Sequence, residues 1–173
     1  MTPPTNPAGE FSEPSGLTPL NHAELIAVIA AAPGHLKAAV HDLTDTQLDT
    51  KYVNWSIRQI VHHLADSHIH SYARFKWALT EENPTIKPYD ETRCAALPDS
   101  LSGGICQPLA LFEGLHGRWL QLMRTMNDSQ FRRTFYHPES KKSVSLENAL
   151  SYYAWHCRHH TAQIVWLREQ HRF

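Results

Sequence analysis

Residues 146–170 read LENALSYYAWHCRHHTAQIVWLREQ, a stretch without proline or glycine that predicts one long helix. Ser145 stands directly before it as an N-cap, and Glu147 lies in the first turn, where the helix dipole favours an anion. On a helical wheel centred on Leu146, the apolar positions within about 40° are Leu150, Tyr153, Cys157 and Ile164. A helix with one apolar side must pack against other elements, so this stretch favours a helical bundle.

Two histidines share that apolar side. His160 lies about 40° and His156 about 80° from its centre, whereas His159 lies about 140° away. Imidazoles at positions i and i+4 can bind one metal ion together, as in the H-x-x-x-H helices of metalloenzymes. A hydrogen-bonded pair of core histidines is the alternative, although sharing an ion would remove the desolvation cost of two unpaired rings.

A second long helix, about residues 55–80, carries further histidines. Asn54 or Ser56 can cap it, and it should end before Asn83-Pro84. With Ile57 at 0°, the neighbours at positions 62 and 63 lie about 140° and 120° away on opposite sides, whereas His68 lies about 20° away. Periodicity therefore does not choose a third ligand among His62, His63 and His68.

The rest of the chain completes an all-α four-helix bundle. Residues 1–20 hold five of the eleven prolines and predict an extended or disordered arm, and residues 21–173 form one domain. A first helix begins near Asn21 and should kink or break at Pro33-Gly34. A third helix spans about 107–126, with Pro108 in its first turn. Between the second and third helices, residues 81–106 form a long loop, and no segment shows convincing strand alternation.

Composition narrows the classes of function. The 173 residues include 16 Lys+Arg and 17 Asp+Glu, for a net charge of −1, which gives no electrostatic case for binding nucleic acid or a membrane surface. No apolar run approaches the ~18 residues of a membrane span, and the first residues lack the features of a signal peptide. Three cysteines form no even framework, so we expect a cytoplasmic protein. The 13 histidines remain the unusual feature.

Long stretches of the chain resemble a known family. Residues 54–91 read NWSIRQIVHHLADSHIHSYARFKWALTEENPTIKPYDE, and residues 135–164 read FYHPESKKSVSLENALSYYAWHCRHHTAQI. These stretches, the opening arm and the LHGRW of the third helix resemble the YfiT-like branch of the DinB superfamily. The resemblance implies a four-helix bundle, a homodimer, and one divalent metal ion per subunit held by His63, His156 and His160. Some relatives carry a further histidine where this chain has Gln163.

Three neutral imidazoles would leave an open coordination position on zinc, or on nickel as an alternative ion. The resemblance reaches bacillithiol S-transferases and mycothiol-dependent enzymes. Our leading hypothesis is therefore a low-molecular-weight-thiol (bacillithiol-type) S-transferase that activates the thiol as a metal-bound thiolate and acts on a small-molecule substrate. The alternatives are a hydrolase that uses metal-bound hydroxide and a non-catalytic, stress-related metal-binding module.

Other residues have weaker functional interpretations. Arg74 can bind an anionic group and His137 can approach the site, so both are possible catalytic helpers, against the alternatives of an ordinary ion pair and a turn residue. Tyr89 and Asp90 can line the mouth of a pocket, join a subunit contact, or pack an ordinary loop. The expected acceptors for the ligand N–H groups are Asp66, Glu147 and Gln163. The residues expected to serve packing are Trp55, Trp119, Tyr153, Trp155 and the small buried Cys157.

Overall fold

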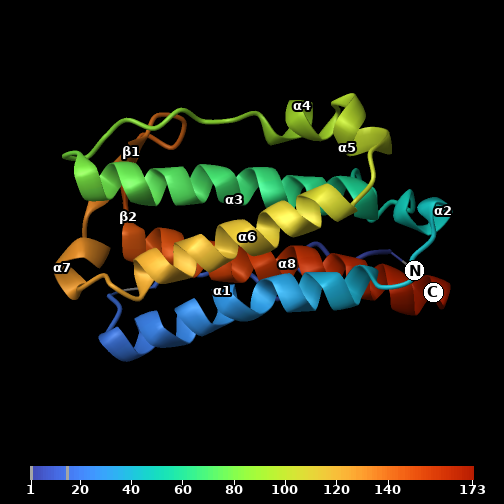
Figure 1. Cartoon of the computed structure of the whole chain (residues 1–173), viewed down its shortest axis with the longest axis horizontal. Coiled ribbons are helices and arrows are strands. Elements are labelled where there is room, and N and C mark those ends of the chain that lie inside the picture. The colour runs from blue at the N-terminus through green and yellow to red at the C-terminus, as the bar shows by residue number, and fades with distance from the viewer. Residues whose placement is uncertain (1, 15) are drawn as a thin grey trace.

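The computed structural model describes residues 2–14 and 16–173, and four long helices form its bundle (Figure 1). They are α1 (Pro19–Val40), α3 (Ile57–Thr80), α6 (Cys106–Met123) and α8 (Leu146–His171). Helix α1 packs against α6 and α8, and α3 packs against the same two helices. The first two long helices therefore occupy diagonal corners of the bundle.

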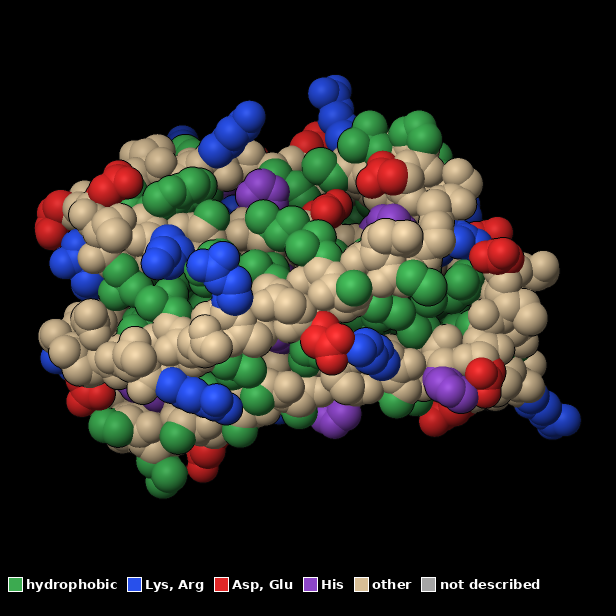
Figure 2. Space-filling view, in the orientation of Figure 1, with side chains coloured by type: hydrophobic (Ala, Val, Ile, Leu, Met, Phe, Trp, Pro, Cys, Tyr) green, Lys and Arg blue, Asp and Glu red, His purple; other side chains and the backbone are tan. Residues whose placement is uncertain are grey.

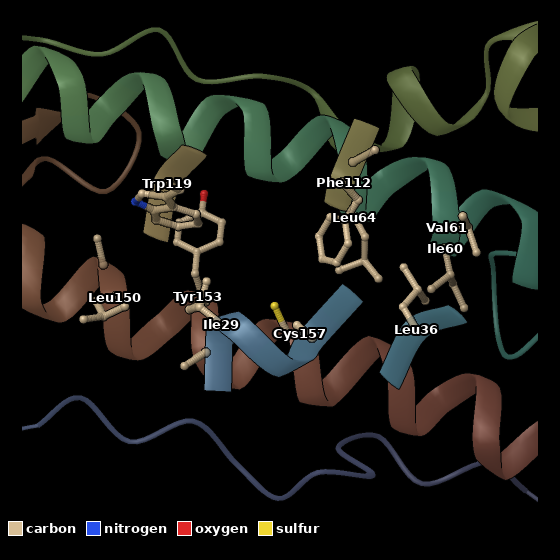
Figure 3. Packing of buried hydrophobic residues seen from close by; sticks show 14 of the residues in the cluster. Ile29, Leu36, Ile60, Val61, Leu64, Phe112, Trp119, Leu150, Tyr153 and Cys157 are labelled. Atoms are coloured by element: carbon tan, nitrogen blue, oxygen red, sulfur yellow. The ribbon is translucent and has the colours of Figure 1, made fainter. Parts of the chain in front are cut away.

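The core lies between these four helices. Trp119, Phe75 and Phe112 are its largest fully buried side chains, and Leu64 and Leu150 pack in the same cluster. In Figure 3, Trp119 and Tyr153 lie together on one side of the core, and Phe112 and Leu64 lie together further along it. The predicted core roles of Trp119 and Tyr153 are confirmed, since both side chains are buried.

Hydrogen-bonding N-caps set where the elements begin. Ser56 caps α3 in a capping box with Gln59, and Ser145 caps α8 by accepting the backbone N–H of Asn148. Two short helices, α2 (Asp45–Leu48) and α7 (Asp128–Phe131), begin with capping boxes at Thr44 and Asn127. A short capped helix therefore precedes each of the two histidine-bearing helices.

Helix α1 is not broken at Pro33-Gly34, where we expected a kink or a break. It begins at a Thr18 capping box and runs as one helix from Pro19 to Val40, with Pro33 buried inside it. Proline has no N–H, so the carbonyl of Ile29 loses the helical donor that a residue at position 33 would supply. That carbonyl accepts a hydrogen bond from His116 of α6 instead, at 2.8 Å, which compensates for the missing helical bond.

The structure contains a small antiparallel hairpin, whereas we expected a bundle without strands. Strand β1 (Thr134–His137) pairs with β2 (Lys142–Ser145), and Thr134 faces Ser145 in the register. Residues 84–86 extend this sheet, because Ile86 N–H donates to the Tyr136 carbonyl and Tyr136 N–H donates to the Pro84 carbonyl. The segment directly before α8 is therefore tied to the segment that follows α3.

The long connection between α3 and α6 is more ordered than a loop. It contains α4 (Glu91–Ala95) and α5 (Pro98–Ser102), which lie along α3 (Figure 1). Buried Arg58 of α3 joins three segments: its guanidinium pairs with Asp45 and Asp49 and donates to the Gly103 carbonyl. This network fixes the connection over the first turns of the helix that carries His63.

The N-terminal arm packs on the bundle. Residues 2–14 contain no helix or strand, and α1 begins at Pro19, inside the range 1–20 that we expected for the arm. Tyr52 donates to the Pro4 carbonyl, and Trp155 donates to the Gly9 carbonyl at 2.8 Å. The Phe11 ring lies 5.8 Å from that of Trp155. Trp155 therefore packs against the N-terminal arm.

The length and hydropathy of α1 would suffice for a membrane span, which the sequence analysis did not anticipate. In the bundle, the helix packs against α6 and α8 and buries Ile29, Leu36 and Val40. On the face shown in Figure 2, acidic and basic side chains are interspersed, and some histidines reach the surface. Eight of the 13 histidines are nevertheless buried inside the protein.

Candidate metal centre

Helices α3 and α8 bring His63, His156 and His160 together. Their side chains are buried, with relative exposures of 3%, 5% and 8%. One ring nitrogen from each lies within 4.8 Å of the others, and His63 Nε2 lies 3.1 Å from His156 Nε2. The ring centroids of His156 and His160 are 4.5 Å apart, as expected for stacked i and i+4 positions.

Each of the three rings uses its Nδ1 for a hydrogen bond elsewhere. His63 Nδ1 lies 3.1 Å from the Tyr89 hydroxyl, and His160 Nδ1 lies 2.8 Å from Gln163 Oε1. His156 Nδ1 lies 3.4 Å from Nε2 of His68. Within the described residues, the Nε2 atoms are therefore the ring nitrogens without a partner outside the cluster, and those of His63 and His156 face each other.

Gln163 is the expected acceptor that the structure places in contact with the cluster. Within residues 2–14 and 16–173, Asp66 and Glu147 make no hydrogen bond to these rings; Glu147 instead lies 3.4 Å from His22 Nε2. The expectations for Asp66 and Glu147 are wrong, because Glu147 sits in the first turn of α8, far along the helix from His156. The partner of His63 Nδ1 is instead Tyr89, and the partner of His156 Nδ1 is His68.

Burial keeps the cluster neutral. It lowers the pKa of His63 to about 4, and it lowers the pKa values of His156 and His160 well below their usual range, with further lowering from neighbouring histidines. Neutral imidazole is the form that binds metal. In the described part of the chain, no carboxylate joins this group.

The donor set fits a divalent ion. Tetrahedral Zn–N bonds of about 2.0–2.1 Å separate two ligand nitrogens by about 3.3 Å, close to the 3.1 Å between His63 Nε2 and His156 Nε2. If both nitrogens are unprotonated, their lone pairs repel unless an ion lies between them. Trp55 covers the site, with ring centroids 4.5 Å from His63 and 6.2 Å from His160. Trp55, which we expected to serve packing, therefore packs directly against two histidines of the cluster.

A cavity of about 640 Å³ borders the cluster through His156 and Tyr89. Arg74 and His137, the two expected helpers, both line it, together with Asp90. Arg74 is buried and donates to the Tyr153 hydroxyl at 3.2 Å. The interpretation of Tyr89 and Asp90 as residues of a pocket wall therefore matches their position. The remaining walls come from the arm, α8 and the hairpin, and include Phe11, Glu13, Phe135, Lys142 and Tyr152.

A larger cavity of about 860 Å³ lies between α1 and α8. Residues such as Val28, Ala32, Ala162 and Val165 line it. The buried Cys157 also lies on its wall, and its sulfur is 3.7 Å from His68 Nε2. Burial raises the pKa of this thiol, which agrees with its predicted role as a small buried hydrophobe. Among the described residues, the wall of the 640 Å³ cavity includes a histidine of the candidate metal centre, His156, whereas that of the 860 Å³ cavity includes none of the three.

The structure assigns the other histidines on these helices to different surroundings. His159 lies beside the cluster and receives the Gln163 amide at 3.0 Å, and His62 is buried without a hydrogen-bond partner for its Nε2 in the described structure. His68 is fully buried between α3, α6 and α8. The sequence analysis assigned no role to His68 or His116, although the wheel did place His68 near the centre of the apolar face.

Fold and site together define a helix-bundle protein with a buried three-histidine cluster beside a cavity. The chain belongs to the DinB superfamily, whose pattern matches residues 17–164. It is 48% identical over 161 residues to the Bacillus subtilis protein named "Putative metal-dependent hydrolase YfiT". This match covers 92% of this chain and 90% of that protein.

Two further comparisons agree. An Oceanobacillus iheyensis protein with the same type of name is 46% identical, and the match covers 92% of each chain. The solved structure of Bacillus subtilis YfiT, described as a probable metal-dependent hydrolase with an unusual four-helix bundle topology, matches with a TM-score of 0.95. That match has 46% identity and covers 98% of both chains. The diagonal placement of α1 and α3 is thus part of a fold shared with this relative.

Proposed function

We propose that the chain is a metal-dependent S-transferase that joins a low-molecular-weight thiol to an electrophilic small molecule. His63, His156 and His160 hold the divalent ion. The observation that carries the proposal is the meeting of three neutral imidazoles beside a cavity, in a cluster that no carboxylate joins within the described residues. A hydrolytic site of the H-E-x-x-H type would place a carboxylate there as the general base.

Three protein ligands suit zinc, and nickel or another first-row ion is compatible with the same imidazoles. Such an ion, when bound, supplies Lewis acidity that lowers the pKa of a thiol or water in its open position. The chain's own contribution is orientation: Tyr89 and Gln163 hold the rings of His63 and His160 with Nε2 toward the ion.

Arg74 binds an anionic group of the thiol substrate. Its guanidinium is buried, lines the cavity, and has no carboxylate within 4.0 Å in the described structure. Its contacts are the Tyr153 hydroxyl and the Phe135 ring, whose centroid lies 5.9 Å from Cζ. A buried cation without a carboxylate partner is costly, and a substrate carboxylate would neutralise it.

His137 accepts the proton that the thiol loses. Its Nδ1 is buried and makes no hydrogen bond within the described residues, and the ring lines the cavity. Burial, reinforced by the positive charge of Arg74, lowers the pKa of His137, which favours the neutral ring that can accept a proton. In the transfer, the S–H proton moves to Nδ1, sulfur bonds to the electrophilic carbon, and the leaving group departs with its electron pair.

Hydrolysis is the second candidate, favoured by the names of the relatives. The same pocket would then bind an ester or amide, and water would replace the thiol. The cavity of about 640 Å³ has the usual size of a small-molecule site and fits either reaction, so the cluster that no carboxylate joins within the described residues is what favours the transferase. Homodimerisation and a cytoplasmic location stay predictions that rest on the resemblance and the composition.

The test compares thiol transfer with hydrolysis in the same preparation. Zinc-loaded protein is incubated with a thiol such as bacillithiol and a chlorinated aromatic electrophile, and separately with a p-nitrophenyl ester in water. We expect thiol conjugation well above the uncatalysed rate, lost in the His156→Ala, His160→Ala double variant. The control His171→Ala removes an exposed histidine of the same helix and should retain activity.

Conjugation at the uncatalysed rate with rapid ester cleavage would overturn the transferase in favour of the hydrolase. Stoichiometric zinc binding without either activity would support the non-catalytic metal-binding alternative. Full zinc retention by the double variant would overturn the ligand set itself.

A further inference from the structure

Behind His156, hydrogen bonds continue through the core of the bundle. His156 Nδ1 lies 3.4 Å from His68 Nε2, and His68 Nδ1 lies 3.0 Å from His116 Nε2. His116 Nδ1 in turn lies 2.8 Å from the Ile29 carbonyl oxygen. The series takes one residue from each long helix, in the order α8, α3, α6 and α1. We call it the histidine chain.

The far end of the histidine chain is anchored by a proline. A helical carbonyl normally accepts the N–H of the residue four positions later. For Ile29 that residue is Pro33, which has no N–H, so the carbonyl is open to His116. Pro33 thus provides a fixed acceptor inside an otherwise regular helix.

The carbonyl oxygen of Ile29 determines which ring nitrogen carries the proton in each histidine of the histidine chain. A carbonyl only accepts, so His116 must carry its proton on Nδ1 and present a lone pair at Nε2. His68 must then donate from Nδ1, which leaves its Nε2 as an acceptor. His156 must therefore donate from Nδ1, and its Nε2 is left with the lone pair that faces His63.

These proton positions hold for neutral rings, and the surroundings of the three histidines favour the neutral form. His68, His116 and His156 have relative exposures of 0%, 1% and 5%. Within the described residues, no carboxylate oxygen lies within 4.0 Å of any of these rings. The ring of His68 is enclosed by Phe112 and Trp119, with centroids 4.9 and 5.9 Å away.

We propose that Ile29, His116 and His68 lock the tautomer of His156, so that its Nε2 is ready to bind the ion before the ion arrives. This inference rests on the metal centre proposed above, and it makes His68 and His116 positioning residues. The opposite tautomer of His156 would place a proton on Nε2. It would also reverse His68 and bring two lone pairs, on His68 Nδ1 and His116 Nε2, to 3.0 Å.

A second ion is the competing explanation for this group. His68, His116 and Cys157 also lie close enough together to bind one. In Figure 3 the Cys157 sulfur points into the core, and it lies 3.7 Å from His68 Nε2. In the tautomer that the histidine chain requires, the thiol S–H and His156 Nδ1–H share the one lone pair of His68 Nε2. The hydrogen bonds of His68 and His116 thus account for the cluster without an ion.

The test reads proton positions directly in the metal-free protein. Long-range ¹H–¹⁵N spectra of ¹⁵N-histidine-labelled protein at pH 7.5 distinguish Nδ1–H from Nε2–H. We expect His156, His68 and His116 each to show Nδ1–H. In His116→Leu, we expect His68 and His156 to show mixed tautomers and zinc affinity, measured against a chelator, to fall about tenfold.

Two further variants distinguish an effect of the hydrogen bonds on the His156 tautomer from an effect of altered core packing. In His116→Gln, the amide carries a donor for Ile29 and an acceptor for His68, so the single tautomer and much of the affinity should return. Phe112→Leu alters the same buried surroundings without a hydrogen-bonding atom, and it should leave the His156 tautomer and the zinc affinity unchanged.

Several outcomes would overturn the proposal. They are an Nε2–H proton on His156 in the wild-type protein, an unchanged spectrum and affinity in His116→Leu, and uptake of a second equivalent of zinc that depends on Cys157. The wild-type spectrum decides the question even if a variant fails to fold. A protein that shows the expected tautomers and binds zinc but transfers no thiol would overturn the proposed function alone.

Discussion

At the scale of single residues, a hydrogen bond at Nδ1 holds each of the three clustered imidazoles. Partners of this kind orient a metal ligand and raise its basicity, and losing one costs about 10–100-fold in metal affinity. For His160 the partner is Gln163, whose amide is itself oriented by a hydrogen bond to His159.

The first prediction concerns this glutamine. Gln163→Leu removes the acceptor for His160 Nδ1, so we expect zinc affinity to fall at least about tenfold in chelator competition. Gln163→Glu keeps an acceptor oxygen and should bind zinc at least as tightly as the wild-type protein. Equal affinity of all three proteins would show that the hydrogen bond does not position His160.

The second prediction concerns Arg74. Arg74→Gln removes the charge from the cavity wall but leaves the three histidines untouched. Because hydrogen bonds to charged groups contribute about 1.5–3 kcal/mol, we expect the KM for an anionic thiol to rise at least about tenfold, with the zinc content unchanged. A lower zinc content, or an unchanged KM, would show that Arg74 serves the fold rather than the substrate.

The third prediction concerns pH and the metal-free protein. Burial lowers the pKa values of His63 and His116 from about 6.5 to about 4. Between these values the unfolded chain binds more protons than the folded chain, so stability is complete above about pH 6.5 and falls as pH drops toward 4. Each ring contributes on the order of a few kcal/mol to this loss.

Urea unfolding of the apoprotein at several pH values checks this dependence. His116→Leu removes one of these buried rings and should give a shallower loss of stability toward acid, whereas the exposed His171→Ala should give the wild-type slope. A stability that stays flat from pH 7 to pH 4.5 would contradict the burial of neutral rings.

Sequence reasoning at this scale located part of the site. The wheel placed His156 and His160 together on the inward side of α8, where the structure also has them. It could not select His63 over His62 and His68, because a wheel reports only the direction from a helix axis and not the element that lies there; all three are buried. The two rings face different neighbours: His63 faces α8 and Tyr89, and His68 faces α6.

At the scale of elements, N-caps are the features that sequence predicted best. Ser56 and Ser145 were identified as possible caps, and each accepts a backbone N–H in the structure. These signals are local, so they need no knowledge of the fold. The hairpin was missed because its strands are short and one of them, β2, is largely exposed, so neither shows a clear alternation.

The fourth prediction belongs to α3. Ser56→Ala removes one half of the capping box with Gln59, whose amide also donates to the Ala95 carbonyl at 2.8 Å. We expect a loss of about 1 kcal/mol in the free energy of unfolding, measured by urea denaturation. Ser143→Ala, on the exposed strand β2, is the matched control and should change stability by less than about 0.5 kcal/mol. Equal losses in the two variants would contradict the capping role.

At the scale of the whole molecule, the arrangement of helices was beyond sequence reasoning. Periodicity identifies the apolar side of each helix but not its neighbours, so the diagonal placement of α1 and α3 had to come from the structure. This placement gives α6 and α8 contact with both other helices. It lets one series of hydrogen bonds run from α1 to His156 of the candidate metal centre on α8.

The central claim is that three histidines from two helices bind one ion, and a crystal structure of the zinc-loaded protein tests it most directly. Anomalous diffraction at the zinc edge should give one peak per chain, with Nε2 of His63, His156 and His160 each about 2.0–2.1 Å from it. A peak held by Cys157 with His68 and His116, or a peak that lacks any one of the three nitrogens, would contradict the account.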